Sequence, residues 1–273
     1  MDHVTELGQL VTTYSEALHH HSVLHRYWSA LSLVLKGSYA RGDADQYSDL
    51  DFVLVTDAAN FSAIVADYRA AGLSHRADGI FLPLGDWDGH YNLMTFEQLQ
   101  AALTPAATAS LWEYSNVKIL HDPNQRYARA KTQALTDFHR ALPNLLQQEY
   151  LTMRLQLDWL RQPLRRADRR AAVLYATSFW RAACRLILLL HETPFPPDKW
   201  LFRSLQKLDA TPLITAAMAY DETFSTLPTM PAEIELADYP VYAAGLALTE
   251  QLITALQQRF PEAEWLDQWY LYA

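Results

Sequence analysis

Two apolar runs separated by a polar loop form the segment that most restricts what this chain can fold into. Residues 33–57 read LVLKGSYARGDADQYSDLDFVLVTD, and the second run carries Asp49 and Asp51 at its start. Side chains i and i+2 of a strand project from the same face. The alternation therefore predicts a strand that buries Leu50 and Phe52 in the core and presents both carboxylates on its other face.

A pair of adjacent carboxylates is stable only with a cation nearby, because like charges repel each other. Mg²⁺ suits such a pair, since it usually binds one or two carboxylates together with phosphate oxygens. Gly37 lets the backbone approach a phosphate closely, and Ser38 with the following amides, at the start of a short helix, can donate to phosphate oxygens. A hydrated acidic loop is the simpler alternative, but the periodicity places Asp49 and Asp51 on a strand.

The same residues resemble the signature of the DNA-polymerase-β-like nucleotidyltransferases. Gly37-Ser38 is followed, after ten residues, by Asp49-Leu50-Asp51, with a small residue, Gly42, in the loop. The sequence SDLD is similar to the small-molecule branch, the kanamycin, streptomycin and lincosamide nucleotidyltransferases. The resemblance implies Mg²⁺-dependent transfer of a nucleoside monophosphate, AMP from ATP, to a hydroxyl of a small acceptor such as an aminoglycoside.

Two further segments resemble parts of that family more weakly. VKILHDPNQ (117–125) is similar to the strand and Asp-Pro turn that often close the domain, and PFPPDKWLFRSL (194–205) is similar to a Lys-Trp segment of attached helical domains. The second resemblance implies that Lys199 contacts a phosphate of the nucleotide.

The third carboxylate of the family pattern is missing. Members generally carry it on a later strand, where this sequence has Asn92. An amide binds metals weakly and cannot accept a proton at neutral pH. Asp88, Asp86, Glu97 or Glu113 are the candidates to replace it. Two alternatives stay open: a nucleotide-binding regulator with little or no activity, and an enzyme that nucleotidylates a protein or tRNA.

Apolar periodicity divides the chain into a first part of mixed strands and helices and a second part that is helical. Strands are predicted at SLVLKG, LDFVLVT, GIFLPL and HYNLMT. Helices are predicted over 5–30, 60–72, 95–103, 105–117, 126–160, 167–191, 197–208, 211–220 and 240–260. We therefore predict an α/β or α+β domain with a small mixed sheet at 1–125 and an all-α helical bundle at 126–273, separated by the turn HDPNQ.

Charge is distributed unevenly between these parts. The net charge is −9; residues 1–125 carry 6 Lys/Arg and 15 Asp/Glu, whereas residues 126–273 carry 16 of each. An acidic first domain suits a cationic acceptor. Residues 154–185 contain eight Arg and two Asp. That stretch could bind a triphosphate or RNA, although a solvated helix face with pairs such as Arg154–Asp158 is favoured.

Cysteine usage and the terminal sequence indicate a cytoplasmic protein. Cys184 is the single cysteine and lies in an apolar stretch, which favours a buried thiol in a reducing compartment. The first residues are acidic and amphipathic, unlike a signal peptide, and the apolar run at 186–190 is too short to span a membrane. The expected partners are a nucleoside triphosphate and a small acceptor, without a membrane or a required nucleic acid; the oligomeric state is left open.

Overall fold

The computed structural model describes residues 3–84, 87–224, 227 and 235–273. The chain divides into two compact units, Met1–Phe138 and His139–Ala273, and each is described by itself. We call them unit 1 and unit 2.

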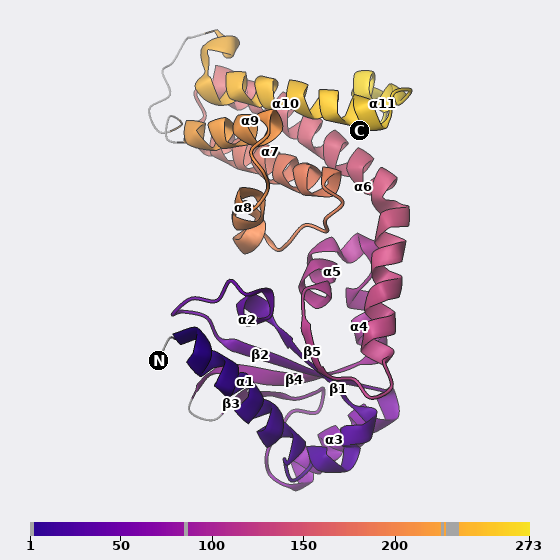
Figure 1. The fold of residues 1–273 in the computed structure, drawn as a ribbon. Coiled ribbons are helices and arrows are strands. Elements are labelled where there is room, and N and C mark those ends of the chain that lie inside the picture. The colour runs from indigo at the N-terminus through magenta and orange to yellow at the C-terminus, as the bar shows by residue number, and fades with distance from the viewer. Residues whose placement is uncertain (1–2, 85–86, 225–226, 228–234) are drawn as a thin grey trace. The chain divides into compact units, whose positions relative to one another are not determined.

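Unit 1 is built on a mixed five-stranded sheet in the order β3-β4-β2-β1-β5. The strands are β1 Ser32–Lys36, β2 Leu50–Thr56, β3 Phe81–Leu84, β4 Trp87–Thr95 and β5 Lys118–His121. Strand β2 pairs in parallel with β4, and the other pairs are antiparallel. The helices of this unit are α1 His3–His19, α2 Gly37–Arg41, α3 Ala58–Ala70, α4 Phe96–Ala102 and α5 Thr108–Ser115, with the 3-10 segments η1 Leu24–Ala30 and η2 Pro105–Ala107 (Figure 1).

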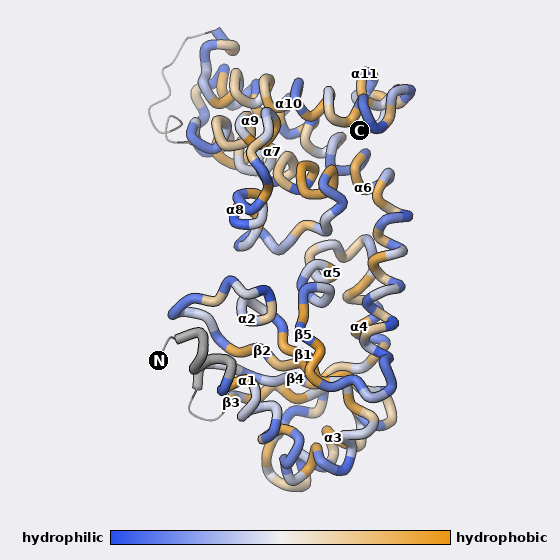
Figure 2. Tube along the Cα trace, in the orientation of Figure 1, coloured by the Kyte–Doolittle hydropathy of each residue, from blue (hydrophilic) through white to orange (hydrophobic). Residues whose placement is uncertain are grey.

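One face of the sheet forms the main core of unit 1. Leu50 and Phe52 are 2% and 0% exposed and pack with residues of α1 and α3 such as Leu18, Ile64 and Tyr68. Figure 2 shows the hydrophobic character of β1 and β2, which favours this burial. The predicted alternation is confirmed for Leu50, Asp51 and Phe52, because Leu50 and Phe52 face the core while Asp51 projects to the other side of β2. The prediction that Asp49 also lies on this strand is wrong, since β2 begins at Leu50 and Asp49 directly precedes it.

Helix α6 (Arg126–Arg165) starts in unit 1 at the predicted HDPNQ turn. Asp122 accepts hydrogen bonds from the Ser32 hydroxyl at 2.7 Å and from the backbone N–H groups of Tyr127 and Ala128. The Tyr127 hydroxyl also donates to the Tyr114 carbonyl at 2.8 Å. These bonds tie the first turns of α6 to the sheet, so the compact units divide further along, inside the helix. The functional division at residue 125 stays a prediction.

Unit 2 contains helices and no strand among its described residues. Besides the second part of α6 these are α7 Arg169–Leu190, α8 Asp198–Gln206, α9 Pro212–Glu222, α10 Pro240–Arg259, α11 Glu264–Asp267, η4 Leu236–Asp238 and η5 Trp269–Leu271. Helices α7, α9 and α10 pack side by side (Figure 1). The predicted fold class, a small mixed-sheet domain followed by a helical region, is confirmed.

Helix α7 contributes ten buried residues to unit 2. It is the one described helix whose length and composition would allow it to cross a membrane, and half of that apolar window is buried inside the structure. Cys184 lies in the buried part, and burial raises the pKa of its thiol. Helix α7 therefore serves as a core helix of this unit, with Cys184 as a packed side chain.

The helix predicted over 5–30 is interrupted. Helix α1 ends at His19 and the chain continues as the 3-10 segment η1 from Leu24. The His19 ring stacks on Trp28, with ring centroids 4.7 Å apart, and Trp28 stacks on His121 of β5 at the same distance. This aromatic stack fixes the chain reversal before β1, a tertiary contact that helical periodicity does not reveal.

Candidate functional site

Three charged or titratable side chains lie in one row across neighbouring strands. Lys36 of β1 pairs in register with Asp51 of β2, and Asp51 pairs in register with His90 of β4. The row lies where β2 and β4 begin and β1 ends, so the chain reverses into α2 directly beside it. The sheet thereby holds a carboxylate between a cation and an imidazole.

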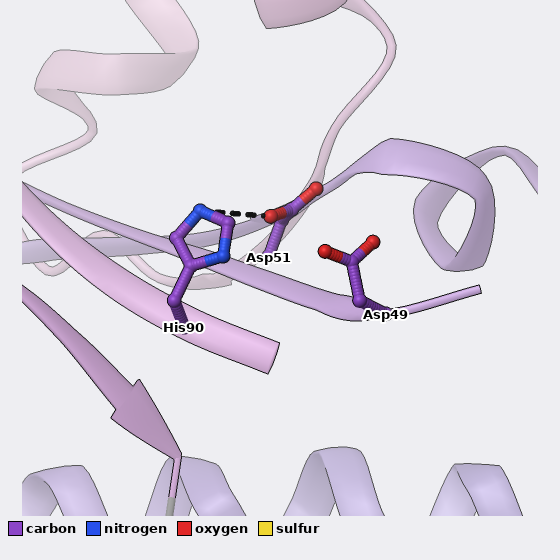
Figure 3. Close-up of side chains that lie close together, drawn as sticks. All are labelled: Asp49, Asp51 and His90. Carbon is purple, nitrogen blue, oxygen red and sulfur yellow. Dashed lines mark ion pairs between the residues drawn. The ribbon is translucent and has the colours of Figure 1, made fainter. Parts of the chain in front are cut away.

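Asp49 completes a cluster with Asp51 and His90 (Figure 3). One ligand atom from each residue lies within 4.8 Å of the others. His90 Nε2 is 3.0 Å from Asp51 Oδ1. Asp49 is exposed, whereas the side chain of Asp51 is 15% exposed. The cluster is therefore open on the side of Asp49 and closed around Asp51.

The environment of Asp51 opposes its negative charge. Burial raises the pKa of the Asp51 carboxyl and the nearby Asp49 adds to that rise, while Lys36 and His90 act against it. Lys36 Nζ lies 2.9 Å from Glu113 Oε1. Burial by itself would lower the pKa of Lys36, but Glu113 and then Asp51 outweigh it and raise that pKa. Lys36 therefore stays cationic and serves two carboxylates at once.

Gly37 allows the backbone to pass directly over Asp51. Its φ is +80°, and a Cβ at this position would lie 2.9 Å from Asp51 Oδ2. Any other residue would be strained in this conformation and would push the carboxylate aside. Ser38 follows in α2 and is 6% exposed. The predicted Gly-Ser turn and short helix are confirmed, and they adjoin the carboxylate pair.

The donor set fits a divalent cation. Carboxylate oxygens such as those of Asp49 and Asp51 are the ligands that Mg²⁺ prefers. The imidazole of His90 is a nitrogen ligand, which broadens the set towards first-row transition metals. Gly37 also places no side chain of its own between its backbone and the carboxylate of Asp51. The residues present are therefore compatible with a metal held mainly by Asp49 and Asp51.

The other residues singled out in the sequence lie at different distances from this cluster. Asn92 pairs with Val53, two residues further along β4 than His90, which is about 7 Å along a strand. Its Oδ1 atom is buried without a hydrogen-bond partner among the described residues. Glu113 is joined to the row through Lys36. Glu97 lies in the first turn of α4, beyond the opposite end of β4.

Three predicted residues cannot be placed in the cluster by contacts. The backbone of Asp88 lies on β4, two residues before His90. Asp86 lies outside the described residues. Lys199 lies on α8 of unit 2, with Nζ 5.8 Å from the ring centroid of Trp200. Their roles stay predictions.

His90 is the residue that sequence reasoning missed. Strand alternation in WDGHYNLMT puts residues 90 and 92 on one face, so either could face Asp51. Which of the two residues lies beside Asp51 depends on the register between β2 and β4. The sequence of two parallel strands separated by a helix does not reveal that register. The observed register sets His90, not Asn92, beside Asp51.

Comparison with known proteins identifies one family match, in the first part of the chain. The family model described as a nucleotidyltransferase domain matches residues 21–81, a range that includes Gly37, Ser38, Asp49 and Asp51. Among solved structures, the chain is similar to a nucleotidyltransferase-like protein from Exiguobacterium sibiricum, with 14% identity, a TM-score of 0.44, and coverage of 93% of this chain and 79% of that chain. No curated protein matches this chain. The domain match supports nucleotidyl transfer as the general activity.

Proposed function

We propose that this chain is a Mg²⁺-dependent nucleotidyltransferase that moves AMP from ATP to a hydroxyl of a small acceptor, with an aminoglycoside-like compound as the first candidate. The observation that carries the proposal is the group formed by Asp49, Asp51 and His90 beside Gly37. This arrangement fits an in-line displacement at the α-phosphorus, in which the acceptor oxygen enters and pyrophosphate leaves. The net charge of −9 is compatible with a cationic acceptor.

Each residue of the site has a distinct role in this proposal. Asp49 and Asp51 hold the metal, which when bound supplies positive charge to the phosphate oxygens. Gly37 and Ser38 bring backbone N–H groups to the triphosphate, and Lys199 is proposed as an additional phosphate contact. Lys36 favours the ionised form of Asp51, because its positive charge lowers the cost of a second negative charge next to Asp49.

His90 is proposed as the residue that positions Asp51. Its Nε2 lies 3.0 Å from Asp51 Oδ1, and a neutral imidazole that donates from Nε2 keeps a lone pair on Nδ1. Phe81 lies against the ring, with centroids 4.3 Å apart, and limits its rotation. The proton of the acceptor hydroxyl requires a base, for which Asp88 and Glu113 are the proposed candidates. Asn92 cannot serve as one.

A nucleotide-binding regulator is the second candidate function. The observation that favours it is again His90. On β4 this residue lies opposite Asp51, at the position where a third carboxylate would complete the metal ligands. If the protein is such a regulator, His90→Asp should create transfer activity. Asn92→Asp should not, because residue 92 lies opposite Val53 and not opposite Asp51. In an active enzyme His90→Asp should instead lower the rate, because three carboxylates would raise the pKa of Asp51 further.

The test is transfer of label from nucleoside triphosphates. The protein is incubated with Mg²⁺ and α-labelled ATP, CTP, GTP or UTP, alone and with hydroxyl-bearing acceptors that include aminoglycosides. We expect label from ATP to appear on a small acceptor and to disappear when EDTA is added. Label on the protein or on tRNA would change the acceptor class, and nucleotide binding without transfer to any acceptor would favour the regulator.

A further inference from the structure

The turn between α6 and α7 concentrates positive charge in unit 2. Residues 161–170, RQPLRRADRR, contain five Arg and one Asp, although residues 139–273 hold 13 Lys/Arg against 15 Asp/Glu. Arg165, Arg166, Arg169 and Arg170 are all exposed. No ion pair or side-chain hydrogen bond joins these four to another described residue. We call these four residues the arginine turn.

Other arginines of the same unit are engaged within the protein. Arg181 and Arg185 both pair with Asp198, and Arg259 pairs with Glu192 at 2.7 Å. Arg154 lies over the ring of Trp269, 5.0 Å from its centroid. The predicted pair Arg154–Asp158 is wrong, because Asp158 pairs with Arg161, three residues further along α6. Pairing within a helix is therefore found for Arg161, and none is found at the arginine turn among the described residues.

A groove with aromatic walls adjoins the arginine turn. Its volume is about 530 Å³, and its lining includes Trp159, Arg161, Arg166 and Tyr175, together with Asp158 and Asp168. Trp159 is 47% exposed and meets Tyr175 edge to face, with centroids 6.1 Å apart. The groove therefore offers a half-exposed indole ring beside guanidinium groups.

The two acids of the groove are already occupied. Asp158 pairs with Arg161 at 3.0 Å, and Asp168 accepts from the Ala171 N–H at 3.1 Å as the N-cap of α7. Arg161 Nε is buried and has no partner among the described residues. The acids thus do not neutralise Arg166 or the rest of the arginine turn, and the groove favours an anion.

Backbone hydrogen bonds fix the conformation of the turn that carries these arginines. The N–H of Asp168 donates to the Pro163 carbonyl at 2.9 Å, and that of Ala167 donates to the Leu164 carbonyl at 3.1 Å. Ala167 has a φ of +51°, the left-handed conformation that commonly ends a helix in this bonding pattern. The arginines therefore project from a defined backbone, which lowers the entropy lost when they bind a ligand.

We infer that this groove and the arginine turn bind a single strand of nucleic acid, with a base stacked on Trp159 and phosphates on the arginines. Exposed aromatic faces combined with guanidinium groups are the features that bind single strands. A duplex hides its base faces, and a mononucleotide has too few separated phosphates for four free arginines. This binding is independent of the proposed transfer, since it requires neither ATP nor a metal.

The test measures fluorescence anisotropy of a labelled single-stranded RNA of roughly 12 nucleotides, in EDTA and without ATP. Each phosphate contact contributes about 0.7 to the slope of log affinity against log salt for single strands, so Arg165→Gln with Arg166→Gln should lower that slope by about 1.4. The matched control, Arg69→Gln with Arg76→Gln, removes the same charge from exposed positions of unit 1 and should leave the slope unchanged.

A second variant tests the stacking. Trp159→Leu should weaken binding roughly 5- to 160-fold, the value of one stacked base, with an unchanged circular dichroism spectrum. The inference is overturned if a duplex of the same sequence or AMP binds as tightly as the strand. It is equally overturned if the arginine variant binds like the wild type, or if the protein binds vesicles of anionic phospholipid and no RNA.

Discussion

The row of Lys36, Asp51 and His90 in unit 1, which we call the carboxylate row, and the arginine turn of unit 2 concentrate charge in opposite ways. Asp51 is 15% exposed and lies between His90 and Lys36, so each charge in the row depends on its neighbours. The arginines of the turn are exposed and have no ion pair with any residue that the structure describes. A buried charge group is costly to alter, because removing one member leaves the others unpaired. An exposed group can be altered with little effect on stability.

The largest effect is expected for the metal-binding carboxylates. Asp49→Asn and Asp51→Asn each remove a ligand charge with little change in volume, so nucleotidyl transfer should fall by at least about 10³-fold while the fold is kept. Asp78→Asn is the control, because Asp78 is an exposed acid of the same unit that pairs only locally with Arg76. Transfer rates near that of the wild type in either site variant would refute the assignment of Asp49 and Asp51.

Gly37 and Gly42 allow the contact with Asp51 to be measured separately from backbone strain. Both have positive φ, +80° and +76°, but a Cβ meets Asp51 Oδ2 only at Gly37, and nothing lies within 4 Å at Gly42. Each Gly→Ala change should cost about 1–2 kcal/mol of stability from the left-handed conformation. Gly37→Ala should also lower transfer about 10²-fold by displacing the carboxylate. Equal activity of the two variants would rule out a close approach at Gly37.

Substitution of Lys36 tests how strongly the pKa of Asp51 depends on this cation. Burial raises the pKa of Asp51, and Lys36 is the strongest of the groups that oppose that rise. Activity requires ionised Asp51 and is lost as the pH falls through its pKa. Lys36→Met should raise that pKa, so the acidic limb of the pH–rate profile should move to higher pH. Lys36→Arg keeps the charge and should largely retain the wild-type profile; identical profiles for both variants would contradict this role.

The smallest effect on stability is expected at the arginine turn. Arg165→Gln with Arg166→Gln should change the melting temperature by no more than about 4 °C, since exposed side chains of this kind contribute within about 0.5 kcal/mol each. Thermal denaturation followed by circular dichroism measures this. A large loss of stability would mean that these side chains have protein partners, and the contrast with the carboxylate row would not hold.

Sequence alone was sufficient for the parts of the site that depend on local patterns. The alternation around Leu50 and Phe52 identifies strand β2 and the face that carries Asp51, and Gly37 and Gly42 occupy turns that favour glycine. His90 and Glu113 could not be assigned in this way. The first depends on the register of β4 against β2 and the second on the packing of α5 beside Lys36, and both are tertiary properties.

Nucleotide binding with and without a metal tests the central claim, that Asp49 and Asp51 hold a metal-bound nucleotide, most directly. The melting temperature of the wild type is compared with that of a variant carrying Asp49→Asn and Asp51→Asn, each with ATP in Mg²⁺ and with ATP in EDTA. A ligand that binds only the folded state raises the melting temperature by mass action. The account predicts a clear rise for the wild type with Mg²⁺, a much smaller one in EDTA, and no metal-dependent rise in the variant. Equal shifts in Mg²⁺ and EDTA, or an unchanged metal-dependent shift in the variant, would contradict it.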